Sequence, residues 1–94
     1  MADLDGVWNV RRVSGALPPL IGVRKRIRAD RGETVLLRGP GIPFDVRGLE
    51  LRYRAPFAFF VDRLERNGDG YRGTATAFGR AYGEFELRRS RSDR

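Results

Sequence analysis

Residues 44–54 read Phe-Asp-Val-Arg-Gly-Leu-Glu-Leu-Arg-Tyr-Arg, with apolar and charged side chains alternating on both sides of one glycine. Successive side chains of a β-strand point to opposite faces, so this alternation predicts two short strands, each with one buried and one solvated face. Phe44 and Val46 would lie on the buried face of the first strand. Gly48, between the two strands, predicts a bulge or a corner rather than a full turn.

Extended runs of the same kind recur along the whole chain. We expect eight strands, at residues 6–13, 22–29, 34–38, 43–47, 49–54, 57–65, 71–78 and 82–89. Asp30-Arg31-Gly32-Glu33 and Asn67-Gly68-Asp69-Gly70 predict hairpin loops, because Gly, Asn and Asp tolerate positive φ. The connections are too short for the crossovers that parallel strands need. The sequence therefore predicts an all-β fold, an antiparallel meander of about eight short strands that forms a small closed or half-open barrel.

Length and composition restrict the protein further. Ninety-four residues predict a single barrel domain over residues 1–94, with a frayed basic tail at 90–94. Neither Cys nor His occurs, which removes disulfides, thiolate chemistry and the commonest general base and metal ligand. No catalytic motif is recognisable, so we expect a protein that is not an enzyme and that uses no cofactor or metal. The chain has no apolar run long enough for a membrane span. Residues 1–5 lack the basic and apolar regions of a signal peptide, and we expect a cytoplasmic location.

The alternation also predicts which side chains form the core: Trp8, Val10, Val23, Ile27, Leu36, Phe44, Val46, Leu49, Leu51, Tyr53, Phe59, Val61, Tyr71, Ala75, Phe85 and Leu87. One run departs from it, because residues 57–61 are apolar on both faces. A loop, a ligand or a partner subunit would have to cover the second face. A homodimer formed through Phe57 and Phe60 is one such arrangement.

Gly6-Val7-Trp8 opens the first expected strand, and Arg88-Arg89 closes the last one. This pattern resembles the lipocalin and wider calycin superfamily, in which a Gly-x-Trp begins the barrel and a late arginine packs over the tryptophan. The resemblance implies that Trp8 is buried, that Arg89 or Arg88 stacks on its indole, and that together they close the base of the barrel. It also implies a small apolar or amphipathic ligand inside the barrel.

The ligand-binding residues that we expect lie at the open end of such a barrel. The stiff apolar connection at residues 17–21 would border a shallow pocket through Leu17, Pro18, Leu20 and Ile21. Arg80-Ala81-Tyr82 resembles the Arg-x-Tyr with which intracellular fatty-acid-binding proteins hold a carboxylate, which would add Arg80 and Tyr82, although a solvated turn arginine is the alternative. The net charge of +7 would favour an anionic head group.

A second function class remains open at this point. Arg24, Arg26 and Arg28 would line one face of a strand at about 6.5–7 Å intervals, a spacing that can follow the phosphates of a single strand of nucleic acid. The run has no neighbouring aromatic residues for base stacking, so a solvated, partly ion-paired face is the alternative. The sequence thus favours a non-catalytic ligand-binding barrel, with a single-stranded nucleic-acid-binding module or a protein-interaction module as alternatives.

Overall fold

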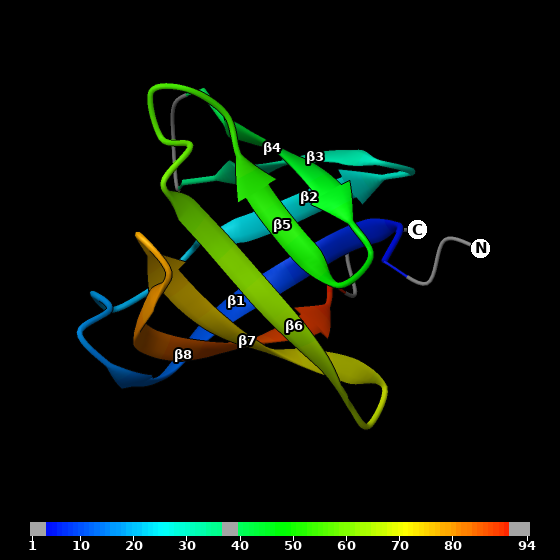
Figure 1. Ribbon diagram of the computed structural model, residues 1–94. Coiled ribbons are helices and arrows are strands. Elements are labelled where there is room, and N and C mark those ends of the chain that lie inside the picture. Colours follow the sequence, from blue (N-terminus) through cyan, green and yellow to red (C-terminus); the bar gives the residue numbers. More distant parts are fainter. Residues whose placement is uncertain (1–3, 37–39, 91–94) are drawn as a thin grey trace.

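The computed structural model describes residues 4–36 and 40–90, and all of its regular elements are β-strands (Figure 1). The strands follow one another as a meander: β1 (Gly6–Gly15), β2 (Arg24–Arg28), β3 (Arg31–Val35), β4 (Ile42–Arg47), β5 (Glu50–Tyr53), β6 (Phe60–Asn67), β7 (Gly70–Ala77) and β8 (Arg80–Arg89). Every neighbouring pair is antiparallel, and β8 pairs back onto β1. The all-β class and the barrel expected from the alternation are confirmed.

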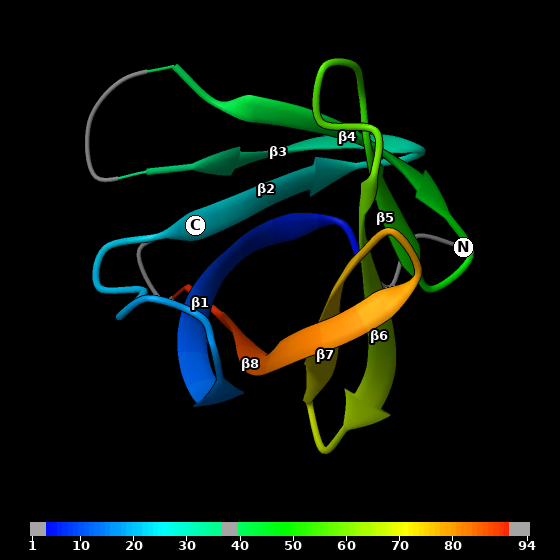
Figure 2. The same ribbon diagram turned by 60° about the vertical axis from the view of Figure 1, so that its left-hand side comes forward.

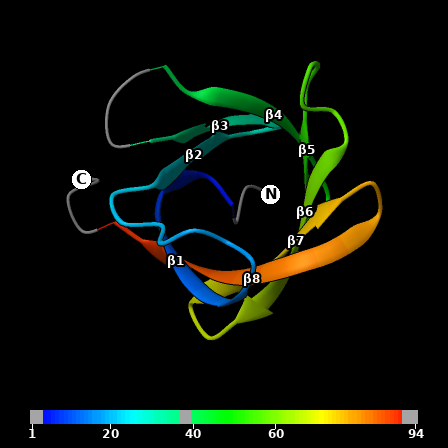
Figure 3. The same ribbon diagram turned by 90° about the vertical axis from the view of Figure 1, so that its left-hand side faces the viewer.

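The first strand closes the ring because it pairs on both of its edges. Trp8 lies opposite Lys25 of β2 on one side and opposite Arg89 of β8 on the other. A shift in register between Arg12 and Ser14 marks a bulge in β1, and such bulges help a strand to bend round a barrel. Figures 2 and 3 turn the molecule until the strands are seen as a ring, with β1 and β8 side by side.

Several strand limits differ from those expected. The strand expected at 57–65 begins only at Phe60, because residues 57–59 form turns in which the Phe57 amide donates to Arg54 O and the Phe60 amide donates to Phe57 O. The loop expected at residues 30–33 is a two-residue turn at 29–30, so β3 starts earlier than expected. Gly48 is not a bulge: with φ of 60° it opens a two-residue turn between β4 and β5.

These shifts explain where the core prediction was wrong. Leu36, Leu49 and Phe59 are exposed, because each lies in a connection rather than on a strand. Val61 is only half-buried, and Val23, Val46 and Tyr53 pack against the core while partly exposed. Leu4 and Leu64 are buried without having been predicted. The remaining predictions are confirmed, since the following side chains are buried: Trp8, Val10, Ile27, Phe44, Leu51, Tyr71, Ala75, Phe85 and Leu87.

Two glycines make room for the largest rings of this core. Gly32 lies opposite Phe44 on the neighbouring strand, and Gly73 lies opposite Phe85. A Cβ atom on Gly32 would lie 2.6 Å from the Phe44 ring, and one on Gly73 would collide with the Phe85 ring. The absence of a side chain at both positions therefore leaves room for each ring over the neighbouring strand.

Trp8 closes one end of the barrel. Its side chain is 1% exposed, its Nε1 donates to Leu4 O at 2.8 Å, and the Tyr71 ring meets it edge-on. The Arg89 guanidinium lies 4.3 Å from the centroid of the indole, and its Nη1 donates to Asp5 O. The expected stacking of a late arginine on Trp8 is confirmed, and Arg89 performs it. Arg88 is exposed, with its Nε 3.7 Å from Glu86 Oε1.

The end of the chain differs in part from the expected frayed tail. Ser90 is buried, and its amide donates to Val7 O at 2.9 Å. The rest of the expected tail, residues 91–94, lies outside the described residues. Within residues 4–36 and 40–90, no helix is long and apolar enough to cross a membrane.

We expect Trp8→Ala to lower the free energy of unfolding by roughly 3–5 kcal/mol, as large truncations in a core do. Urea unfolding followed by circular dichroism measures this change. Ile21→Ala is the matched control, because Ile21 is 86% exposed and its truncation should change stability by no more than about 0.5 kcal/mol. Equal effects of the two variants would contradict a closed base built on Trp8.

Candidate functional site

The barrel contains a cavity of about 220 Å³ that is partly open to solvent. Its walls come from strands all round the ring and from the connections at residues 16–23 and 54–59. Most of the lining is apolar, and the lining residues are Val10, Leu17, Leu20, Val23, Lys25, Thr34, Ile42, Tyr53, Phe57, Phe60, Asp62, Ala75, Tyr82 and Phe85. The open end is the one opposite to Trp8. It is lined by Phe60, the first residue of β6, by Phe57, which precedes that strand, and by Leu17, which follows the far end of β1.

A buried ion pair lies in the wall of this cavity. Lys25 of β2 is 3% exposed, and its Nζ lies 3.2 Å from Asp62 Oδ2 of β6, which is also buried. Lys25 Nζ further donates to Thr34 Oγ1 of β3 at 2.7 Å and to Tyr53 Oη of β5 at 2.8 Å. The side chains of four strands therefore meet inside the barrel, and β2 is connected through its interior to β6.

Aromatic rings surround the same ammonium group. Lys25 Nζ lies 5.3 Å from the centroid of Phe44, 5.4 Å from that of Tyr53 and 5.5 Å from that of Phe85. These distances are within the range in which the face of a ring attracts a cation. The charge removed from water is thus compensated by three oxygen atoms and by the surrounding rings.

Burial and the neighbouring groups shift the pKa values of both Lys25 and Tyr53. Burial by itself would lower the pKa of Lys25, but Tyr53 and Asp62, through charge and hydrogen bonds, outweigh burial and raise it. Burial raises the pKa of Tyr53, against the opposing effect of Lys25. A raised lysine pKa means that the stabilisation from this charge is complete below the unfolded value of about 10.4 and is lost as the pH rises through the folded value.

The residues expected to bind a ligand divide into two groups. Leu17, Leu20 and Tyr82 line the cavity. Pro18, Ile21 and Arg80 do not; all three are exposed. Arg80 is the first residue of β8 and follows the turn at residues 78–79, which leaves its side chain in solvent. The arginine expected to hold an acidic group is therefore not part of the cavity, and Lys25 is the one cationic side chain among the described residues that line it.

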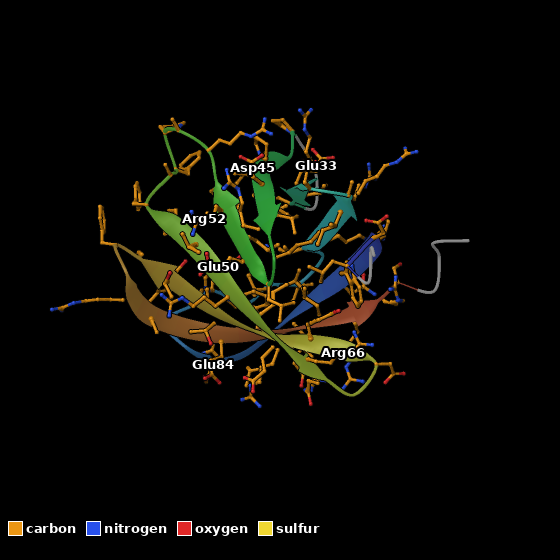
Figure 4. The ribbon with its side chains drawn as sticks, turned by 45° about the vertical axis from the view of Figure 1, so that its right-hand side comes forward. Glu33, Asp45, Glu50, Arg52, Arg66 and Glu84 are labelled. Carbon is orange, nitrogen blue, oxygen red and sulfur yellow. The ribbon has the colours of Figure 1, made fainter. Side chains whose placement is uncertain are left out.

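The outer face of the barrel carries most of the charge. Arg24, Arg26 and Arg28 are exposed along β2, as the alternation predicted. Elsewhere on this face arginines form ion pairs, such as Arg54 with Asp45 at 2.7 Å and Arg52 with Glu50 at 2.8 Å. Figure 4 shows Asp45, Glu50, Arg52 and Glu84 on the outside of the ring.

The residues expected to form a homodimer contact are Phe57, which is exposed, and Phe60. Phe57 and Phe60 both line the cavity, and Phe60 is half-buried. Phe59 and Phe78 are exposed beside them, with their rings stacked 4.5 Å apart. The apolar run at residues 57–61 is thus partly covered by the barrel itself. A homodimer through Phe57 and Phe60 stays a prediction.

Sequence reasoning missed the polar group inside the barrel. Lys25 lies between Arg24 and Arg26 and was not among the predicted core residues, although it shares the parity of Val23 and Ile27. Asp62 shares the parity of Leu64, but the expected strand placed Phe59 and Val61 inward instead. A lysine in phase with apolar residues, in a chain whose other basic residues are all arginine, was the available signal.

No group of three or more acidic, His or Cys side chains in the described part of the chain could hold a metal ion. Fold and cavity together define a small closed antiparallel β-barrel with a partly polar interior. Comparison of the chain with family models, with curated proteins and with solved structures finds no match.

We expect Lys25→Met to lower the free energy of unfolding by about 3–5 kcal/mol, because it leaves the Asp62 carboxylate buried without its counter-charge. Urea unfolding at neutral pH measures this. The double variant Lys25→Met with Asp62→Leu should recover most of the loss, since Thr34 and Tyr53 can still bond to each other at 2.6 Å. Single and double variants of equal stability would show that the ion pair is not formed in solution.

Proposed function

We propose that this protein is a non-catalytic binding protein that takes one small, predominantly apolar molecule into the open end of its barrel. The observation that carries the proposal is the cavity of about 220 Å³, lined by apolar side chains and by a few polar ones. Ligand sites are typically concave and apolar, with a small number of polar groups that fix the orientation of the ligand. The lining described above has this composition.

The size of the cavity limits the size of the ligand. An apolar cavity of about 150 Å³ in another protein accommodates benzene, whereas drug-sized ligands need about 300 Å³ or more. A cavity of about 220 Å³ therefore suits a molecule of roughly eight to ten non-hydrogen atoms. A single ring with a short substituent or a short alkyl chain has this size, and a long-chain fatty acid does not.

The resemblance to calycins adds support of a more general kind. Trp8 and Arg89 occupy the places that the resemblance assigns to the base of the barrel. The resemblance implies a closed base and a ligand inside the barrel, and Phe57, Phe60 and Leu17 line the cavity at the end opposite to Trp8. We therefore propose a calycin-like small barrel.

The rival functions have less support. The exposed aromatic side chains among the described residues lie on the connections at 54–59 and 78–79, whereas Arg24, Arg26 and Arg28 lie on β2. A nucleic-acid strand that followed these arginines would find no ring beside them on which to stack its bases. For a protein-interaction module, nothing in the structure indicates what would cover the exposed Phe59 and Phe78.

Toluene is a suitable first probe, because its seven non-hydrogen atoms fit the cavity. We expect saturable chemical-shift changes in ¹H–¹⁵N NMR spectra at Val10, Val23 and Ala75. Ala75→Leu should abolish them or weaken binding at least about tenfold, since Ala75 is 2% exposed and lines the cavity, and three added carbon atoms would occupy it.

Ala81→Leu is the matched control, because Ala81 is exposed on the adjoining strand β8. It should bind toluene as the wild type does. Binding that is unchanged in the folded Ala75→Leu variant, or no binding by the wild type, would contradict a ligand site in this cavity.

A further inference from the structure

We propose that the ligand of this cavity carries a neutral hydrogen-bond donor, a hydroxyl or an N–H, and that it donates to Asp62 Oδ1. This inference rests on the proposed function and specifies the class of ligand. The net charge suggested an acidic head group, which would accept hydrogen bonds. The proposed group donates one instead.

The ammonium group of Lys25 has no capacity left for a ligand. A lysine has three N–H donors, and Lys25 already reaches three oxygens, those of Thr34, Tyr53 and Asp62, at 2.7, 2.8 and 3.2 Å. The rings of Phe44, Tyr53 and Phe85 lie round the same nitrogen. A ligand carboxylate could reach Lys25 Nζ only by displacing one of these oxygens.

Asp62, in contrast, keeps one carboxylate oxygen available. Its Oδ2 contacts Lys25 Nζ at 3.2 Å and Tyr53 Oη at 3.4 Å. Both of these contacts are made by Oδ2, and Oδ1 makes no hydrogen bond to the described residues. Every fully enclosed polar side-chain atom among those residues has a hydrogen-bond partner. Oδ1 must therefore be accessible, and because Asp62 lines the cavity with only 9% of its side chain exposed, this oxygen is accessible from the cavity.

A carboxylate oxygen that holds no proton can only accept hydrogen bonds. An apolar molecule that covered Oδ1 without donating to it would leave a buried acceptor unsatisfied, which is costly. A ligand with one donor group avoids this cost and gains a charge-assisted hydrogen bond. Tyr82 lines the same cavity, and its phenol, whose pKa is raised by burial and then by the charge of Asp62, stays neutral at physiological pH.

The charge balance favours a neutral donor over a cation. Lys25 and Asp62 contribute charges of opposite sign only 3.2 Å apart, so their charges largely cancel. A ligand ammonium would be desolvated within reach of Lys25 and would find no second carboxylate, since Asp62 is the one acidic side chain among the described residues lining the cavity. A hydroxyl or amide N–H needs no such compensation.

The experiment compares ligands of matched size on the wild-type protein: toluene, benzyl alcohol, benzyl methyl ether, benzylamine and benzoate. Dissociation constants come from NMR titration at neutral pH. Benzyl alcohol should bind at least about tenfold more tightly than benzyl methyl ether, because only the alcohol donates a hydrogen bond to the carboxylate. Benzylamine and benzoate should both bind more weakly than the alcohol.

Asp62→Asn provides a second and sharper comparison. The amide oxygen should turn toward Lys25 in the place of Oδ2, which leaves the NH₂ group, a donor, facing the cavity. The preference should then reverse, with the ether binding at least as tightly as the alcohol. Glu65→Gln is the matched control on the exposed face of the same strand, and it should leave the wild-type order unchanged. The ¹H–¹⁵N spectrum shows whether each variant is folded. If Asp62→Asn does not fold, the ligand series on the wild-type protein alone tests the preference for a donor.

The outcomes separate the two proposals. If toluene and the other probes all fail to bind, the proposed function fails. If toluene binds but the alcohol and the ether bind equally, or if benzoate or benzylamine binds most tightly, the ligand-binding cavity stands and the assignment of a neutral donor is overturned. An unchanged preference for the alcohol in a folded Asp62→Asn variant would also overturn it.

Discussion

Closure of the sheet between the first and last strands is the constraint on which the other features of this barrel depend. A meander of eight strands has two free edges, and both are removed when β8 pairs with β1. The register of that pairing places Arg89 opposite Trp8, so the stacking that covers the base follows from how the ring closes. Leu4 and Asp5 complete the base because their carbonyl oxygens accept from Trp8 and Arg89.

Closure also brings distant strands within reach of one side chain. Lys25 and Asp62 lie on β2 and β6, which do not pair, and they meet because both side chains point into a narrow interior. Lysine suits this position better than arginine. Its ammonium has three donors for the three available oxygens, whereas a guanidinium would bring five N–H groups in a planar arrangement.

The two ends of the barrel are chemically different. One end is closed by Trp8 and Arg89. The other opens into a cavity between Phe57, Phe60, Leu17 and the buried polar group. A barrel of this size has little volume to leave empty, and the space it leaves lies against the single buried carboxylate of the described lining. Under the proposed function, the size and the polarity of the cavity, rather than the positive charge of the outer face, restrict the ligand.

The sequence by itself determined the fold class, because alternation such as that of Phe44, Val46 and Leu51 depends only on the period of a strand and on which face is buried. It also predicted that Trp8 is a core residue, and the resemblance to calycins implied that Arg88 or Arg89 stacks on it. It did not determine the polar interior. Lys25 stands in a row of arginines. The assignment of Asp62 to the inner face depended on the phase of the alternation in β6, and a shift of one residue turns every side chain of a strand to the other face. Only the tertiary structure decided that Lys25, Thr34, Tyr53 and Asp62 meet, because their contact arises from ring closure across strands far apart in the chain.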